Sequence, residues 1–119
     1  MPETSLTMKN FLVIFREPDG RTITHSEEEN SRHQLNWKNW FEKYGKEGKI
    51  AGGSGLTLNG KIIRGVHSEI ADEIHTVGTE IVGGFLLLKA EDLEEAAEIA
   101  KTCPIYEFDG YAEVREMSD

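Results

Sequence analysis

The most apolar stretch of the chain is IVGGFLLLK, residues 81–89. Side chains of a strand alternate between the two faces of its sheet. Phe85 and Leu87 would therefore face one side of the sheet. Leu86 and Leu88 would face the other. A strand that is apolar on both faces belongs where both faces are covered, so we expect residues 81–89 to form the central strand of a sheet.

Strand and helix patterns lie on both sides of this run. Residues 8–16, MKNFLVIFR, are rich in β-branched and aromatic residues and predict another strand. Ser26 and Glu29 can form a capping box, and aromatic residues at helical spacing follow as far as Tyr44. The other expected elements are a strand over 50–56, a hairpin that turns at Asn59-Gly60, a helix capped by Asp92 whose inner face is Leu93, Ala96, Ala97 and Ala100, and a last strand over 111–117.

This order of elements predicts an α+β fold, a ferredoxin-like βαββαβ sandwich with an extra hairpin. We expect residues 1–7 to be a loose lead-in and residues 8–117 to form a single domain. Two helices that return to one side of a sheet cover only one of its faces. A second copy of the same sheet would cover the other face. We therefore expect a homodimer joined sheet to sheet.

The composition excludes several classes of partner. The chain has 119 residues, with 13 Lys and Arg against 22 Asp and Glu, and a net charge of −9. So acidic a surface repels phosphate, which argues against nucleic acids and anionic membranes. No apolar run approaches the length of a membrane span, no signal peptide pattern occurs, and Cys103 is the only cysteine. A cytoplasmic location is expected.

His33 is the most informative polar residue. It lies four residues before Trp37, on the same face of the predicted helix as the aromatic residues. A histidine near a helix start and at the edge of a core can act as a base in a cleft. It can also be a structural histidine, hydrogen-bonded at the core edge, which is the commoner case. The residues themselves leave both interpretations open.

Other chemical motifs are weak. The segment from His67 to Glu80 contains imidazoles and carboxylates, but their spacing fits no metal signature. The glycines of 52–55 do not lead into a helix as a phosphate-binding loop does. They favour close backbone approach beside a pocket or a bulge in the strand. Neither Ser54 nor Cys103 has an activating context. We therefore expect no metal, no cofactor and no covalent catalysis.

The stretch TEIVGGFLLLKAEDLEEAAEIAKTCPI (79–105), followed by EVRE (113–116), resembles YCII-related proteins of the branch named for a DGPF motif. SEEE, His33 with Trp37, and Gly60-Lys61 extend the resemblance over roughly residues 8–117. It implies the dimeric α/β-barrel group, and small-molecule enzymes in which a histidine and an aspartate line a cleft beside the sheet.

Within this resemblance, His33 matches the histidine of the first helix, and Asp72 matches the first position of DGPF. Glu73, Ile74 and His75 stand where the family has glycine, proline and phenylalanine. These replacements change the turn and introduce a titratable ring.

The resulting hypothesis is an enzyme that transfers a proton on a small, cyclic substrate, by elimination, isomerisation or dehydrochlorination. His33 would be the general acid or base, and Asp72 would orient it. Trp37, Ser54 and His75 would line the pocket. The alternative is a non-catalytic module that binds a ligand or regulates a protein partner.

Overall fold

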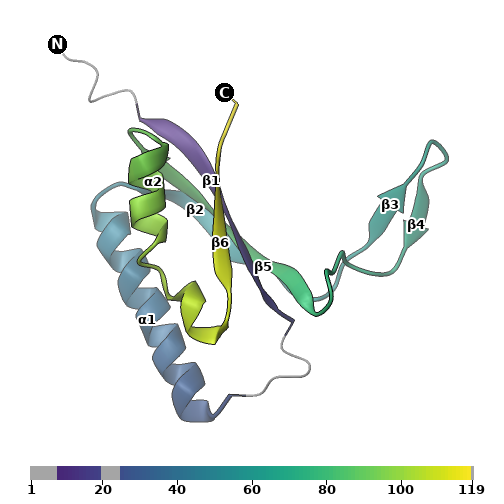
Figure 1. Cartoon of the computed structure of the whole chain (residues 1–119), viewed down its shortest axis with the longest axis horizontal. Helices are drawn as coiled ribbons and strands as arrows, with labels where there is room; N and C mark the ends of the chain where they lie inside the picture. The colour runs from purple at the N-terminus through teal and green to yellow at the C-terminus, as the bar shows by residue number, and fades with distance from the viewer. Residues whose placement is uncertain (1–7, 20–24, 119) are drawn as a thin grey trace.

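The computed structural model of the protein describes residues 8–19 and 25–118, so the predicted lead-in, 1–7, lies outside the described residues. The elements in chain order are β1 (Lys9–Pro18), α1 (Glu27–Lys46), β2 (Ile50–Gly55), β3 (Ile62–Arg64), β4 (Glu69–Ala71), β5 (Glu80–Ala90), α2 (Leu93–Ala100), the 3₁₀ helix η2 (Pro104–Phe108) and β6 (Tyr111–Glu116) (Figure 1). Among these residues, no helix is both long enough and apolar enough to cross a membrane.

The main sheet has four antiparallel strands in the order β2-β5-β1-β6. The run at 81–89 lies in β5, an inner strand, as its apolar pattern predicts. Because β1 and β5 are neighbours although α1, β2 and the hairpin separate them in sequence, the connections cross over as in a ferredoxin-like sandwich. The predicted α+β class and element order are confirmed.

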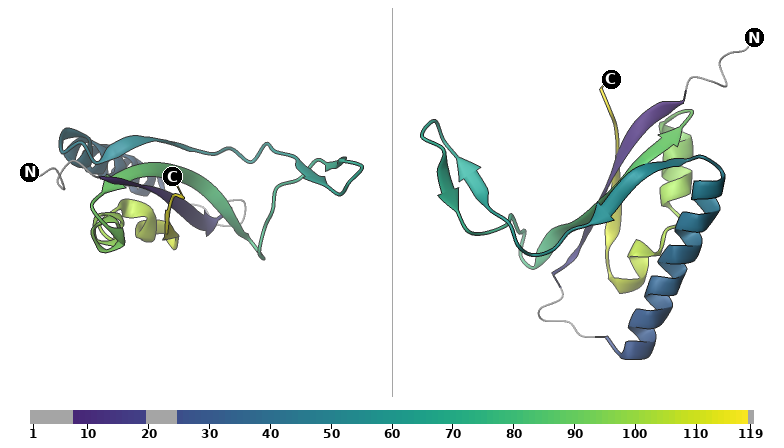
Figure 2. Two further views of the ribbon diagram at one scale, coloured as in Figure 1. Left: turned by 90° about the horizontal axis from the view of Figure 1, so that it is seen from above. Right: turned by 180° about the vertical axis from the view of Figure 1, so that it is seen from behind.

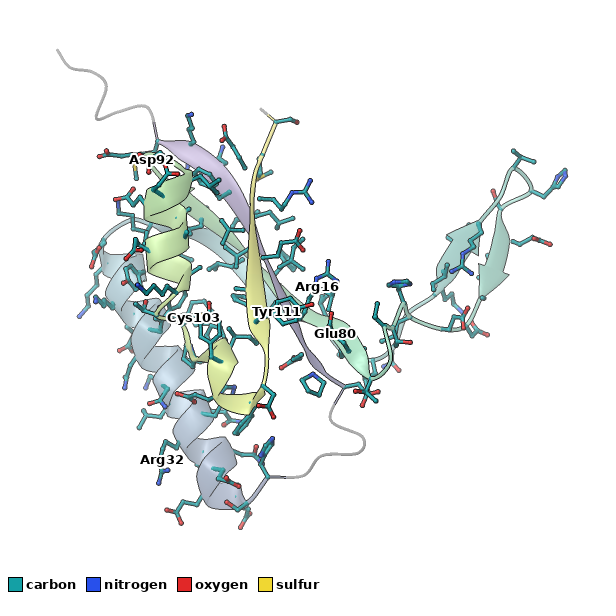
Figure 3. The ribbon with its side chains drawn as sticks, in the orientation of Figure 1. Arg16, Arg32, Glu80, Asp92, Cys103 and Tyr111 are labelled. Carbon is teal, nitrogen blue, oxygen red and sulfur yellow. The ribbon has the colours of Figure 1, made fainter. Side chains whose placement is uncertain are left out.

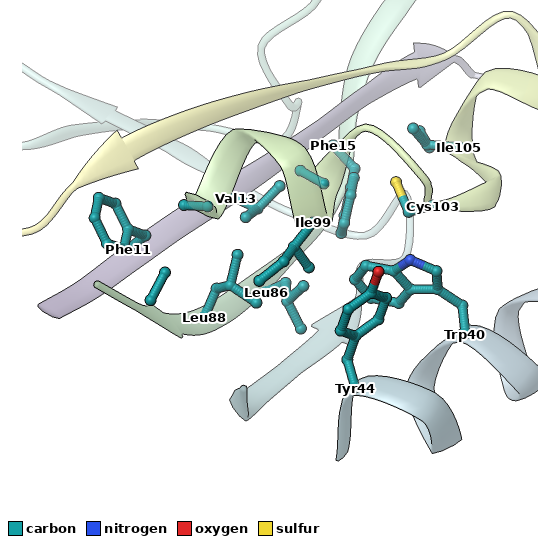
Figure 4. Packing of buried hydrophobic residues seen from close by; sticks show 13 residues of the cluster. Phe11, Val13, Phe15, Trp40, Tyr44, Leu86, Leu88, Ile99, Cys103 and Ile105 are labelled. Atoms are coloured by element: carbon teal, nitrogen blue, oxygen red, sulfur yellow. The ribbon is translucent and has the colours of Figure 1, made fainter. Parts of the chain in front are cut away.

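Both helices pack on one face of this sheet. Phe11, Val13, Leu86 and Leu88 point toward the helices and form the core with Trp40, Tyr44, Ala96, Ile99 and Ala100 (Figure 4). The register pairs Leu12 with Leu87, and Ile14 with Phe85, on the opposite face. We call the face that carries these four residues the open face. The sheet is therefore apolar on both sides, and its own helices cover one of them.

The predicted helix starts are confirmed. The Ser26 hydroxyl accepts the N–H of Glu29 at 3.1 Å, and the Glu29 carboxylate accepts the N–H of Ser26 at 2.8 Å. Asp92 caps α2 by accepting the N–H of Glu95 at 2.8 Å.

The inner face predicted for α2 is partly wrong. Leu93 and Ala97 are exposed, whereas Ala96, Ile99 and Ala100 are buried. At 100° per residue, positions 96, 99 and 100 share one narrow stripe, and 93 and 97 lie at its edge. In this helix of about two turns, only the residues of that stripe pack against the core.

The predicted hairpin, with its turn at Asn59-Gly60, is wrong: β3 pairs instead with β4, which lies in a segment for which no strand was predicted. Residues 65–68 form the turn, where Gly65 (φ 82°) and Ser68 (φ 54°) are left-handed and the Ser68 N–H donates to Gly65 O at 3.0 Å. This turn places Ile63 opposite Ile70. With a turn at Asn59-Gly60, Ile63 would not pair with Ile70. Cross-strand pairing therefore overrides the local turn preference.

We call residues 56–79, which carry the β3–β4 hairpin, the arm. Figure 2 shows that it stands away from the sheet and helices, and within the described chain β3 and β4 contact no other element. The radius of gyration is 16.6 Å, against about 13.5 Å for a compact chain of this length. Ile63 and Ile70 are 62% and 64% exposed. An isolated two-stranded hairpin is only marginally stable in water.

Candidate functional site

A cavity of about 410 Å³ lies between α1 and the edge of the sheet formed by β2 and β5. Its volume is in the range of small-molecule sites. The lining residues come from β1, α1, β2, β5 and η2: Phe15, Glu17, His33, Trp37, Phe41, Gly53, Ser54, Gly55, Gly83, Gly84, Phe85 and Ile105.

The helix side of the cavity is an aromatic wall. Trp37 and Phe41 are one helical turn apart on α1 and stack with their ring centres 5.4 Å apart. Phe15 from β1 meets Trp37 edge to face, with the centres at 5.3 Å. Such a wall suits the face of a planar ligand.

The strand side of the cavity is built from glycines. A Cβ atom on Gly53 would lie 2.6 Å from Phe85 O, and one on Gly84 would lie 2.9 Å from Ser54 O. β2 and β5 therefore approach each other closely only because these side chains are missing. The predicted close backbone approach beside a pocket is confirmed.

Glu17, near the end of β1, places a carboxylate in this cavity. A Cβ atom on Gly83 would overlap Glu17 Oε2, so this glycine leaves the room in which the carboxylate lies. The side chain is partly buried, and with the described residues its carboxylate makes no hydrogen bond or ion pair. Burial raises the pKa of Glu17 above its ordinary value, and the charge of nearby His33 opposes part of this rise.

His33 is held at both ring nitrogens. Its Nε2 lies 3.0 Å from Trp37 Nε1, and its Nδ1 lies 2.8 Å from Glu107 Oε1. An indole N–H can only donate, so Nε2 accepts, and we assign the proton to Nδ1, which donates to Glu107. The ring also stacks on Phe108, with centres 4.3 Å apart. His33 thus lines the cavity as an imidazole that is hydrogen-bonded at both ring nitrogens.

The structure brings together three of the five predicted site residues. His33, Trp37 and Ser54 line the cavity, and the Ser54 hydroxyl donates to Gly55 O at 2.8 Å. Asp72 and His75 lie on the arm, outside the cavity lining, and Asp72 pairs with Lys61. Within one chain, the structure does not bring Asp72 to His33, and the carboxylate on His33 is Glu107.

Two site residues were not identified from the sequence. Glu107 is 74 positions from His33, a separation without any periodic pattern. Glu17 stands at the end of an aromatic strand and just before Pro18. Polar residues at strand ends often carry function, and that position could have marked Glu17.

Among the described residues, no group of three or more histidine, cysteine, aspartate and glutamate side chains is placed to hold a metal ion.

Cys103 is expected to be unreactive in the folded protein. It is buried in the core, and burial raises the pKa of its thiol to about 11. At pH 8, only about one thiol in a thousand would then be ionised. Mass spectrometry should find no iodoacetamide adduct on the native protein and complete labelling in guanidinium. Equal labelling rates in the two conditions would contradict this prediction.

Comparison with known proteins gives one finding. The family model described as the YCII-related domain matches residues 11–118, which is nearly the whole chain. A search of curated proteins gave no match.

Proposed function

Because the chain belongs to the YCII-related domain family, we propose that it is a small-molecule enzyme that removes a proton from a ligand in the cavity. One observation carries this proposal: the cavity combines a partly buried carboxylate that has no partner among the described residues with a histidine of defined tautomer. A carboxylate whose pKa burial raises above its ordinary value is a stronger base than an exposed one, which suits proton transfer. Elimination, isomerisation and dehydrochlorination can all begin with this step: the carboxylate takes the proton, and the electron pair of the broken C–H bond passes into an adjoining carbonyl of the substrate or expels its leaving group, chloride in dehydrochlorination.

In this proposal Glu17 accepts the proton and His33 supports it. Glu17 lines the cavity and has no hydrogen-bond partner among the described residues, whereas a proton taken up by His33 Nε2 would first displace the Trp37 N–H. His33 fixes the Trp37 ring against the ligand. Glu107 fixes the tautomer of His33, a role that carboxylates commonly have toward imidazoles.

The test is exchange of carbon-bound protons with solvent. Small cyclic ketones are incubated with the protein in D₂O, and loss of their α-proton signals is followed by ¹H NMR. We expect faster exchange than in buffer alone. Gly55→Leu is the control, because a Cβ atom at Gly55 meets only Gly83 O, at 3.9 Å, and the larger side chain would then occupy the cavity. Exchange at the rate of the blank, or exchange that Gly55→Leu does not affect, would contradict the proposal.

We further propose that the protein is a homodimer in which a second copy covers the open face. This face has an apolar centre, Leu12, Ile14, Phe85 and Leu87. One end of it is polar: Arg16 pairs with Glu113 at 3.2 Å, and the Tyr111 hydroxyl donates to Glu80 at 2.6 Å (Figure 3). An apolar centre beside a polar rim is typical of protein interfaces. The arm is a second surface that the same partner could cover.

The branch of the family and the cellular location of the protein are also proposals. Asp72, counted back from the matching stretch at Glu80, supports membership of the DGPF branch. We also propose a cytoplasmic location, with which a single buried cysteine, Cys103, is compatible.

A further inference from the structure

The side-chain hydrogen-bond donors around the cavity are all in use. The Trp37 N–H is donated to His33, the assigned Nδ1–H of His33 is donated to Glu107, and the Ser54 hydroxyl is donated to Gly55 O. The described residues that line the cavity include no lysine or arginine. Among these described side chains, the cavity therefore offers a ligand an acceptor but no spare donor.

That acceptor is Glu17. Its carboxylate is partly buried, and with the described residues it makes no hydrogen bond or ion pair. A buried acceptor without a partner is unfavourable, and a ligand that donates to it removes that cost. A cationic donor gains more than a neutral one, because hydrogen bonds between charged groups are stronger.

We propose that the cavity selects uncharged or cationic ring-bearing molecules, which donate an N–H or O–H to Glu17, and rejects anions. The ring would lie against Trp37 and Phe41, whose faces also attract cations. An anion would meet Glu17, and none of the described lining residues is a lysine or arginine that could balance the two negative charges. This inference rests on the proposed function in that it uses the same cavity, and it specifies the class of substrate.

Three probes of one shape test this selection: benzamidinium, benzamide and benzoate. Each is a planar ring with a planar substituent, and they carry positive, zero and negative charge. Binding is followed by the fluorescence of Trp37 and Trp40 at neutral pH and constant ionic strength. We expect benzamidinium to bind at least about tenfold more tightly than benzoate, with benzamide between them.

Two variants assign the selection to Glu17 rather than to the overall charge. Glu17→Gln should reduce the difference between benzamidinium and benzoate to less than about threefold. Glu94→Gln, on the exposed side of α2, makes the same change in net charge and should leave the difference intact. Circular dichroism melting confirms that each variant is folded, and Glu17→Ala replaces Glu17→Gln if the latter is not.

The outcomes separate this inference from the proposed function. Three results would overturn the selection by Glu17 and leave the enzyme proposal standing. The three probes could bind with equal affinity, the difference in affinity could survive removal of the Glu17 carboxylate, or the difference could fall equally in Glu94→Gln. If no probe binds and Gly55→Leu also leaves ketone exchange unchanged, both fail. Binding of benzamidinium that Gly55→Leu abolishes supports the location of the site.

Discussion

Glu17→Gln is expected to lower the rate of proton exchange by about 10²–10⁴-fold, the usual contribution of a positioned general base. The amide has nearly the same shape as the carboxylate but cannot accept the proton. It should therefore still fit the space over Gly83 and leave the melting temperature almost unchanged. Exchange of ketone α-protons in D₂O measures the loss, and Glu94→Gln serves as the matched control.

The pH dependence should identify the same carboxylate. Burial raises the pKa of Glu17, and the base is active only when ionised, so exchange should increase with pH through an apparent pKa above that of an ordinary glutamate. The titratable groups around it are His33 on α1, which Glu107 of η2 holds, and Asp19 and His25 in an adjoining hollow. Glu17→Gln should abolish this increase.

His33→Gln distinguishes the two possible bases. If Glu17 is the base, this variant should keep the rise of exchange with pH, because the carboxylate that titrates is still present. It should lose part of the rate, since Trp37 and Glu107 each lose a hydrogen-bond partner. A variant that loses all exchange, while Glu17→Gln retains it, would make His33 the base instead.

The parts of the fold that follow from local chemistry could be predicted. The capping residues Ser26 and Asp92 act on amides three positions away, and the alternation in 81–89 follows from backbone geometry. The hairpin turn could not be placed in the same way. Its position depends on the cross-strand pairing of Ile63 with Ile70. The local preference of Asn59-Gly60 for a turn carries no information about that pairing.

The same distinction applies to the site. His33 and Trp37 are one helical turn apart, so their shared position beside the cavity follows from helical spacing. Glu107 is 74 positions from His33 in sequence, so only the tertiary fold brings the two side chains together. Asp72 was placed by a motif, but the arm carries that motif away from α1 and pairs Asp72 with Lys61. A motif assigns a residue to a family position, whereas the path of the chain decides what that residue contacts.

Leu87→Asp is expected to dissociate the proposed homodimer into single chains. Leu87 lies at the centre of the open face, opposite Leu12. In a sheet-to-sheet dimer with two-fold symmetry, the variant would bury two unpaired carboxylates. At about 3 kcal/mol for each of them, the dissociation constant should rise by about 10⁴-fold. The variant chain should still fold, since Leu87 faces away from the helix-side core.

Light scattering coupled to size exclusion measures the change. The wild-type chain of 13.4 kDa should elute with twice that mass, and Leu87→Asp with the mass of one chain. Ala97→Asp is the matched control, because it adds the same charge at an exposed position of α2, on the other side of the molecule. It should remain dimeric. A wild-type chain that elutes as a monomer would show that the open face is exposed to water. That result would contradict the proposed dimer and the proposal that a second copy covers the arm.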